Sequence, residues 1–570
     1  MPRLLLPLLA LLCSLSAVPG VSAELVVYTA RKVITMEPAQ PVATAIAVAD
    51  GNIVAVGTLD SLKPWTSTRS TRIDRSLEDK VLLPGFIDAH VHPTLPAVLT
   101  QFPFLAPDDW SLPSGDFPGA KTPAAFERQL RELAAQHTNA DVPFIAWGYH
   151  PLWHGRVYRQ QLNDWFPDKP VMLWHRSFHE LIGNDAAFEL LGMTAQDVGD
   201  SHEVDWDKGH FWENGAMLLL PRMPFLFAPE RIGQGMQNFF RMLHTGGVTT
   251  ALDMGIGIFG DPTAEIALIR QVAQQTNPPS RVILTPIISD FLARGRTTQQ
   301  AMKEIDDWRK DNSPRVMVDR HFKLMMDGAI FSGLAQMGPP GYIDGHSGQW
   351  MAPLEVTTTW ARAFWRAGYK LHAHTNGDAS AAAFIDLLQM LMDTYPRSDH
   401  RMTLEHFAYS TEDQSRQLKA LGAVVSANPY YHYILSDIYS EQWLGGDRGS
   451  QMVRLGSLQR HGVPFALHSD SPMAPLSPLT LAHTAVNRVT INDVASTPRE
   501  QISVEQALRA ITIDAAWVMG WEDRIGSIRA GKKADFTVLE EDPYSVRKSQ
   551  LKDLQIWGTV FEGELYPLVR

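Results

Sequence analysis

Eight apolar runs, most of them followed by a helix-like segment, constrain the fold of this chain more than any other feature of its sequence. The runs are residues 81–92, 248–253, 281–288, 322–326, 370–374, 402–406, 423–427 and 464–470. Amphipathic segments fill most of the gaps, among them residues 264–275, 379–395, 411–421 and 453–461. Strands that alternate with helices indicate parallel α/β architecture, and eight repeats predict a TIM-like (β/α)8 barrel rather than an open sheet.

Short strand-like pieces at both ends of the chain predict a second, smaller unit. They are residues 25–28, 45–49 and 52–57 near the start, and 535–539 and 556–561 near the end. Because neither group is large enough to bury a core alone, we expect residues 24–80 and 525–570 to form one β-sandwich side domain. Residues 81–524 then form the barrel domain.

The connection after the first barrel strand is too long for an ordinary loop. About 155 residues separate His92 from Val248, and structureless loops longer than about 15 residues are uncommon in compact domains. The connection contains a helix-like segment, 124–137, and two strand-like runs, 142–147 and 171–174. We therefore expect an inserted subdomain over about residues 95–245.

Residues 1–23 have the three parts of a secretory signal peptide. Arg3 gives a small positive start, residues 4–15 are almost entirely apolar, and Val21-Ser22-Ala23 has the small residues of a cleavage site before Glu24. A membrane anchor is the alternative, but the apolar run is shorter than the roughly 20 residues that span a bilayer. We therefore expect cleavage, export to the periplasm or the medium, and no stable membrane anchor.

Charge and cysteine content restrict the partners and the chemistry. The chain has 50 Lys and Arg against 62 Asp and Glu, a net charge of −12, and no long basic run, which argues against nucleic acid as a partner. Its one cysteine, Cys13, lies in the predicted signal peptide, so the mature chain has no thiolate to offer a metal. Any metal must therefore be bound through nitrogen and oxygen. The expected partner is a small-molecule substrate, and a homo-oligomer is left open.

Chemically active side chains gather where the apolar runs end. In a barrel the carboxyl ends of the strands meet at one face, where active sites form. The first run ends in His90 and His92, whose alternate spacing directs both rings to the same side of a strand. Lys323 lies within another run, and a lysine inside a barrel needs an electrostatic partner or a shifted pKa. Three further runs end in His374, His406 and Asp470.

These residues belong to longer motifs that resemble those of the metal-dependent amidohydrolase superfamily. The resemblance covers nearly the whole mature chain, including the side domain made from both termini. The superfamily motifs are Pro84-Gly-Phe-Ile-Asp-Ala-His-Val-His92, Leu404-Glu-His406, Ser469-Asp470 and Gly526-Ser-Ile-Arg-Ala-Gly-Lys-Lys-Ala-Asp535. Within the superfamily, the long insertion is typical of the amidohydrolase-3 branch, which includes N-substituted formamide deformylases. The motifs similar to that branch are residues 323–328, His374-Thr-Asn-Gly-Asp378, His179-x4-Asn184 and Gly209-x3-Glu213.

The resemblance implies that His90 and His92 bind one metal ion, with Asp470 as a further ligand. Asp470 would also be the catalytic residue that takes the proton of the attacking water. A divalent cation lowers the pKa of coordinated water from 15.7 to about 7 and polarises a carbonyl, while a nearby carboxylate moves the proton to the leaving amine. Zinc is the expected metal, although Mn, Fe and Co also suit nitrogen and oxygen ligands.

The resemblance also implies a second metal ion, bound by His374 and His406. Lys323, carboxylated on its amine, would bridge the two metals as a carbamate, so two zinc ions per chain are expected. His372 is an alternative to His374 as a ligand, although the Gly-Asp that follows favours His374. We expect His468, two residues before Asp470, to be structural.

Substrate contacts are expected from the insertion, where the branch motifs place His179, Asn184 and Glu213. Trp147 lies in a group of histidines and tryptophans that could build a further metal site, an aromatic wall facing the substrate, or ordinary packing. We favour the wall, with packing next. The other members are His150, His154, His175, His210, Trp153, Trp174 and Trp212.

The sequence therefore predicts an exported metal-dependent hydrolase that cleaves a carbon–nitrogen bond of a non-peptide amide or formamide. Hydrolysis of an ester, a lactone or a cyclic imide would use the same metal centre. A catalytically silent binding or regulatory protein on this scaffold is the alternative from another class, and the complete ligand set argues against it.

Overall fold

The computed structural model describes residues 24–258 and 260–569. Its centre consists of two parallel sheets with nine strands, and eight of these strands correspond to the predicted apolar runs. Each predicted run overlaps one of these eight. They are β6 (Phe86–Val91), β14 (Val248–Ile256), β15 (Arg281–Pro286), β17 (His321–Met325), β18 (Lys370–Thr375), β19 (Thr403–His406), β20 (Val424–Ala427) and β21 (Phe465–Leu467).

The eight strands lie in two parallel sheets that are joined at both ends. The first sheet has the order β16-β15-β14-β6, where β16 is Val316–Val318, and the second has the order β17-β18-β19-β20-β21. Parallel bridges pair Ile287 with Lys323 and Val91 with Ser471, which connects β15 to β17 and β21 to β6. Every residue of β14, β15, β19 and β20 is buried, as expected for parallel strands that are covered on both faces.

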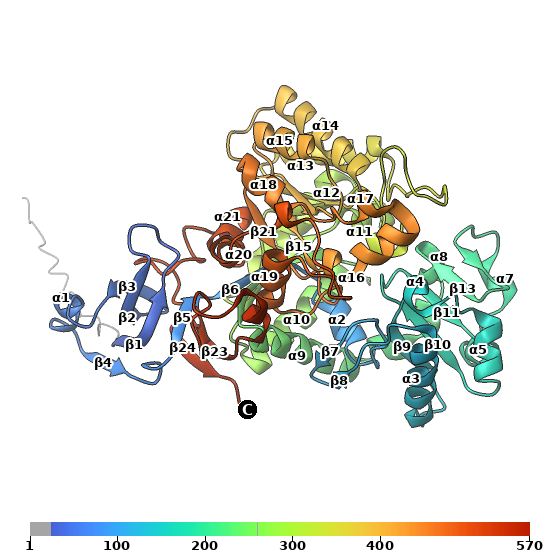
Figure 1. The fold of residues 1–570 in the computed structure, drawn as a ribbon, viewed down its shortest axis with the longest axis horizontal. Coiled ribbons are helices and arrows are strands. Elements are labelled where there is room, and N and C mark those ends of the chain that lie inside the picture. The colour runs from blue at the N-terminus through green and yellow to red at the C-terminus, as the bar shows by residue number, and fades with distance from the viewer. Residues whose placement is uncertain (1–23, 259, 570) are drawn as a thin grey trace, which may run out of the picture.

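Helices cover the outside of these strands (Figure 1). They include α10 (Pro262–Thr276), α13 (Leu354–Arg366), α14 (Asp378–Thr394), α15 (Glu412–Leu421), α18 (Leu455–His461) and α21 (Ile513–Met519). Thr411 caps α15, because its side chain accepts a hydrogen bond from the backbone of Gln414.

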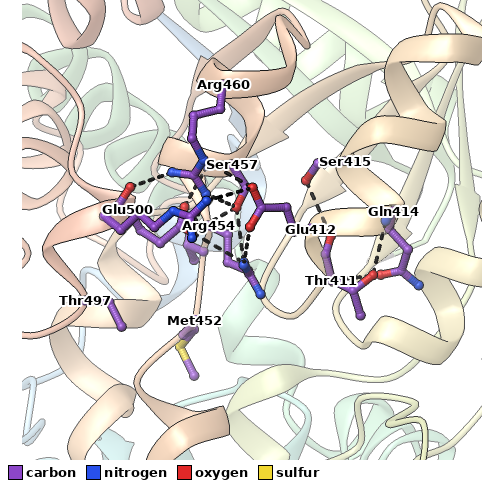
Figure 2. A network of polar contacts seen from close by, with 12 residues as sticks. Thr411, Glu412, Gln414, Ser415, Met452, Arg454, Ser457, Arg460, Thr497 and Glu500 are labelled. Carbon is purple, nitrogen blue, oxygen red and sulfur yellow. Dashed lines mark hydrogen bonds and ion pairs between the residues drawn. The ribbon is translucent and has the colours of Figure 1, made fainter.

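An ion-pair network joins the amino-terminal end of α15 to both ends of α18 (Figure 2). Glu412 of α15 contacts Arg454 at 3.4 Å and Arg460 at 3.2 Å, and Glu500 contacts Arg460 at 3.1 Å. Glu500 is buried and also accepts hydrogen bonds from the backbone and the hydroxyl of Ser457. The network therefore fixes α18, which leads into β21, against α15.

Strands from both ends of the chain pair in one eight-stranded sheet. Its order is β24-β23-β22-β5-β1-β2-β3, and β4 pairs with β1. The bounds are β1 (Leu25–Ile34), β2 (Val42–Ala49), β3 (Asn52–Gly57), β4 (Thr71–Asp74), β5 (Val81–Pro84), β22 (Phe536–Leu539), β23 (Ile556–Phe561) and β24 (Glu564–Pro567). The joining of both ends agrees with the sequence analysis, and the two-layered form of a sandwich stays a prediction.

The run at residues 81–92 is two strands and not one. β5 pairs with β1 and β22 of the terminal sheet, and β6 enters the central strands after Gly85. A side chain at Gly85 would meet the hydroxyl of Thr249 within 2.0 Å. The chain passes from one sheet to the other at a point where only glycine fits.

The long connection after β6 carries a sheet of its own, on the right of Figure 1. Its order is β12-β13-β11-β10-β9, and β7 pairs with β8 beside it. The strands are β7 (Trp110–Leu112), β8 (Gly115–Phe117), β9 (Phe144–Tyr149), β10 (Val171–His175), β11 (Glu180–Gly183), β12 (Val204–Asp205) and β13 (His210–Trp212). Helix α3 (Pro123–Gln136) lies between β8 and β9 in the chain. The predicted helix and both predicted strands of the insertion are therefore present, each within three residues of its expected bounds.

The predicted signal peptide, residues 1–23, lies outside the described residues. Across residues 24–258 and 260–569, the helices are all too short or too polar to cross a membrane.

Candidate metal centre

Three donor atoms converge at the carboxyl ends of the first and last central strands. The Nε2 atoms of His90 and His92 lie 3.3 Å apart. Asp470 Oδ1 lies 3.4 Å from the first nitrogen and 3.2 Å from the second. The bridge between Val91 and Ser471 brings Asp470 to the histidine pair. All three side chains line one cavity of about 820 Å³.

Left-handed backbone aims two of the site's side chains. His406 has a φ of 75° and Asp470 a φ of 54°. Residues other than glycine seldom adopt this left-handed backbone conformation. Successive residues of a regular strand face opposite sides, yet Glu405 and His406 both reach the interior, because the positive φ at His406 ends the alternation. Strain of this kind clusters at functional sites.

Lys323, His374 and His406 lie on the same cavity. The rings of His374 and His406 have centroids 4.3 Å apart. Lys323 Nζ and His406 Nε2 are buried, and neither has a hydrogen-bond partner among the described residues. His374 Nε2 accepts a hydrogen bond from the amide of Asn376 at 2.9 Å, so a cation at this nitrogen requires that contact to open.

His372 is not a metal ligand in this arrangement. Its Nδ1 hydrogen-bonds Glu405 at 2.7 Å and its Nε2 hydrogen-bonds His321 at 2.8 Å, so both ring nitrogens are occupied. It also does not line the cavity, whereas His374 does. This geometry favours His374 over His372, and His374 as a metal ligand stays a prediction.

Glu405 is a central residue of the site that the sequence analysis did not assign. Its carboxylate accepts hydrogen bonds from Nδ1 of His90 at 2.8 Å and from Nδ1 of His372 at 2.7 Å. The first contact places the proton of a neutral His90 ring on Nδ1 and leaves the lone pair of Nε2 facing Asp470. Its place directly before His406 in the Leu-Glu-His motif was the available signal.

Comparison with known proteins agrees with this geometry. A family model described as "Amidohydrolase family" (Amidohydro_3) matches residues 75–566. The chain belongs to the amidohydrolase family. An N-substituted formamide deformylase of Arthrobacter pascens is 25% identical over 556 residues, which cover 93% of this chain and 96% of that protein.

Solved structures of hydrolases share the fold of this amidohydrolase. An uncharacterized metal-dependent hydrolase from Pyrococcus horikoshii OT3 has a TM-score of 0.69 at 19% identity, covering 92% of this chain and 99% of that one. An adenosine deaminase from Xanthomonas campestris with bound zinc has a TM-score of 0.51 at 17% identity, covering 95% of this chain and 92% of that one.

Burial keeps the histidines of this amidohydrolase neutral. It lowers the pKa of His90, His374 and His406 well below the usual value, so each ring has a lone pair available near neutral pH. Burial also lowers the pKa of Lys323 to about 8, against the attraction of Glu405, Asp470 and Asp253. The Lys323 amine is therefore far more often neutral than that of an exposed lysine.

Two further side chains of the site escaped the sequence analysis. Tyr431, which follows the end of β20, donates its hydroxyl to Asp470 Oδ2 at 3.2 Å and lies 3.3 Å from His406 Nδ1. Asp253, on β14, lies 3.8 Å from His92 Nδ1, and burial raises its pKa well above the usual value. Asp253 lies on a central strand and Tyr431 lies near the start of α16 (Tyr430–Tyr439), the helix that follows β20, and these positions were the only signal available.

His468, which we predicted to be structural, lies close to the ring nitrogens of His90 and His406. Among the described residues, two groups have donor atoms within 4.8 Å of one another: His90 with His92 and Asp470, and His90 with His406 and His468. Nδ1 of His468 hydrogen-bonds Ser426 at 2.7 Å, and its Nε2 has no hydrogen-bond partner in the described part of the chain. His468 does not line the cavity, so it lies one layer deeper than Asp470.

Two of the four predicted substrate contacts face the cavity. His179 and Glu213 both line it, and His179 Nδ1 hydrogen-bonds Glu213 Oε2 at 2.7 Å. Glu213 raises the pKa of His179 in opposition to burial. The insertion therefore contributes a polar pair to a wall that is otherwise mostly apolar.

The other two predicted substrate contacts, Asn184 and Trp147, are corrected by the structure. Asn184 is the N-cap of α6 (Asp185–Leu191): its side-chain oxygen accepts from Val171 and Ala187, and its amide donates to Phe166 and Lys169. Trp147 is fully buried and packs on Phe104, at 4.4 Å between ring centroids. Neither residue lines the cavity, so both stabilise the insertion instead.

The aromatic wall is also smaller than expected. Of the four tryptophans in the predicted group, only Trp174 lines the cavity, where it is joined by Phe178. His154 hydrogen-bonds the carbonyl of Ala120, and His210 hydrogen-bonds Glu180. These two histidines are thus occupied by neighbours within the insertion, and the described residues show no cluster of metal-donor atoms there.

Proposed function

We propose that this amidohydrolase is an exported metal-dependent enzyme that hydrolyses the carbon–nitrogen bond of a non-peptide amide or formamide. The observation that carries the proposal is the convergence of donor atoms from His90, His92 and Asp470 in the lining of the cavity. The deformylase relative, which matches nearly end to end, supports an amide or formamide as the substrate class.

The residues present fit a divalent cation. The proton of neutral His90 faces Glu405, so His90 Nε2 directs a lone pair at a second ring nitrogen 3.3 Å away and at a carboxylate oxygen. Without a cation or a shared proton, these electron-rich atoms repel one another. The donor set contains nitrogen and oxygen alone, which suits zinc and also Mn, Fe or Co.

We propose two metal sites. His90, His92 and Asp470 would hold the first, and His374 and His406 the second, with Lys323 between them as a carbamate. The unpartnered, buried Lys323 amine and His406 Nε2 support the second site. When bound, the metal supplies a water of lowered pKa and polarises the scissile carbonyl.

The chain's own side chains orient the reaction and move its proton. Asp470 takes the proton of the attacking water and delivers it to the leaving amine, because it is the carboxylate that both faces the Nε2 atoms of the histidine pair and lines the cavity. Tyr431 donates to Oδ2 of Asp470, which leaves Oδ1 facing the two histidines. Glu405 holds His90 in the required tautomer.

The cavity walls favour a substrate with a bulky apolar substituent. Apart from the donor residues and the His179–Glu213 pair, most of the wall near the site is apolar. Its apolar members include Trp174, Phe178, Met217, Leu220, Met254, Ile258, Met325, Phe331, Met351 and Met473. A pocket of about 820 Å³ is within the range that holds a drug-sized molecule.

The decisive experiment combines metal analysis with turnover on matched compounds. We expect the purified protein to contain a divalent metal and to hydrolyse N-formyl or N-acyl derivatives of apolar amines, and a chelator to abolish the activity. Esters, lactones and cyclic imides that carry the same apolar groups test the alternative that the enzyme hydrolyses one of those three classes. Bound metal with no turnover on any of these compounds would favour the silent binding protein.

Export is part of the proposal and is supported by the positively charged start, the apolar run and the small residues before Glu24. In the native host, we expect the exported protein to begin at or near Glu24, as determined by mass spectrometry. An exported chain that retains Met1 would contradict this expectation.

A further inference from the structure

Arg176, directly after β10 of the insertion, reaches across to the turn that follows Asp470. Its side chain is fully buried. Nη1 donates to the carbonyl of Pro472 at 3.1 Å, and Nη2 donates to the carbonyl of Met473 at 2.8 Å. The backbone N–H of Met473 in turn donates to the carbonyl of Asp470 at 2.7 Å. One guanidinium therefore holds the turn whose first residue is Asp470.

Aromatic rings enclose this guanidinium. Its carbon lies 4.7 Å from the ring centroid of Trp147, 5.0 Å from that of Phe331 and 5.1 Å from that of Trp110. Stacking of this kind stabilises a cation removed from water. The cage also explains the full burial of Trp147, which holds Arg176 and does not contact the cavity.

Packing alone does not account for a charged side chain here. Arg176 has one carboxylate partner among the described residues: Nη2 donates to Asp108 Oδ2 at 3.4 Å, and that oxygen also accepts shorter hydrogen bonds from Tyr430 at 2.7 Å and Trp110 at 2.9 Å. Nε of Arg176 has no hydrogen-bond partner among the described residues. Burying a charge costs free energy that an apolar side chain of similar volume would avoid. An apolar side chain could fill the same space, but it could not donate the two hydrogen bonds that Arg176 makes to the turn.

We infer that Arg176 is a positioning residue that acts through Asp470. By fixing the carbonyls of Pro472 and Met473, it keeps the left-handed backbone of Asp470 in place and its Oδ1 close to the histidine pair. The inserted subdomain thus forms part of the metal centre as well as part of the substrate wall. The inference rests on the proposed function only in taking Asp470 as a metal ligand.

The test is the variant Arg176→Lys. Lysine keeps the charge but cannot donate to the carbonyls of Pro472 and Met473 from one planar group, as the guanidinium does. Zinc affinity, measured by competition with a chromogenic chelator, is expected to fall by about tenfold, the size of effect that residues supporting metal ligands have. In the Asp470→Asn background the same substitution is expected to change zinc affinity by less than about twofold, because coupled residues are not additive. With a confirmed substrate, kcat is expected to fall by about tenfold and KM to stay within about twofold.

Arg281→Lys is the matched control. Arg281 is equally buried and paired with Asp535, but it begins β15 at the end away from the cavity, so zinc affinity is expected to stay unchanged. If Arg176→Lys does not fold, Trp147→Phe weakens the cage while keeping the guanidinium, and a smaller loss of zinc affinity is expected.

The possible outcomes separate the inference from the proposed function. A lower thermal midpoint with wild-type zinc affinity would show a purely structural Arg176 and overturn the inference. A full tenfold loss in the Asp470→Asn background would also overturn it, because Arg176 would then act on another ligand. Zinc affinity that responds as expected in a protein without turnover supports the inference and contradicts the proposed enzyme. A wild-type chain that binds no zinc contradicts both.

Discussion

Replacing Asp470 by Asn is expected to lower turnover by roughly 10² to 10⁴, the range for loss of a general acid–base group. Asparagine keeps the shape of the side chain and one oxygen, but it cannot accept the proton of the attacking water. The hydrogen bond from Tyr431 at 3.2 Å can persist to the amide oxygen. Turnover and metal content should therefore be measured on the same preparation, and metal content is expected to fall less than activity.

Asp535→Asn is a suitable control for this variant. Asp535 is a buried carboxylate that pairs with Arg281 at the opposite end of the strands, so its loss affects stability and not the reaction. At a temperature well below unfolding, its turnover per folded chain is expected to equal that of the wild type. Near wild-type turnover by metal-loaded Asp470→Asn would refute the shuttle role, and Glu213, another carboxylate that lines the cavity, would be the next candidate.

The parts of the site that the sequence predicted are those that follow from strand ends. His90, His92 and Lys323 lie where apolar runs end or pass through the interior, and parallel strands bring such positions to one cavity. The same reasoning placed His374 there, and the pairing of Lys323 with His372 on neighbouring strands puts His374 one layer nearer the cavity. These relations depend on local pattern alone.

The parts that it missed depend on backbone conformation and on long-range contacts. Glu405 was not assigned, because a regular strand would direct it away from the side that His406 faces, and nothing in the sequence shows the φ of 75° at His406. Tyr431 reaches Asp470 from a different strand end, 39 residues away in the chain. Such contacts are set by the closure of the fold and not by spacing.

The two corrected substrate contacts had a different cause. Asn184 matched a motif of the amidohydrolase-3 branch, but a motif does not distinguish a residue that binds substrate from one that caps a helix. Trp147 was predicted to contact substrate because other aromatic residues lie near it in the sequence. Its burial, which the sequence does not show, decides whether it lines the cavity or packs in the core. Arg176, only three residues before His179, had no pattern that marked it.

Substitution of Lys323 by Ala is the second test with a large expected effect. At a pKa of about 8, roughly one amine in ten is neutral at pH 7, against about one in three thousand at the ordinary value of 10.5. A neutral amine is the form that reacts with carbon dioxide, so burial favours the carbamate. A carbamate offers two oxygens where a bare amine offers one lone pair, and two cations need both.

Lys323→Ala is therefore expected to reduce metal content from two ions toward one per chain and turnover by at least about 10²-fold, since removing a ligand costs no less than removing its supporting residues. A short carboxylic acid such as propionate fits the space left behind, supplies two oxygens and should restore part of both. Lys532→Ala, which removes a buried lysine of the terminal sheet region, is expected to leave metal content unchanged. One metal equivalent in both the wild type and Lys323→Ala, with no effect of propionate, would make the centre mononuclear. The unpartnered amine would then act on the substrate directly, and Lys323→Arg would be expected to change KM more than metal content.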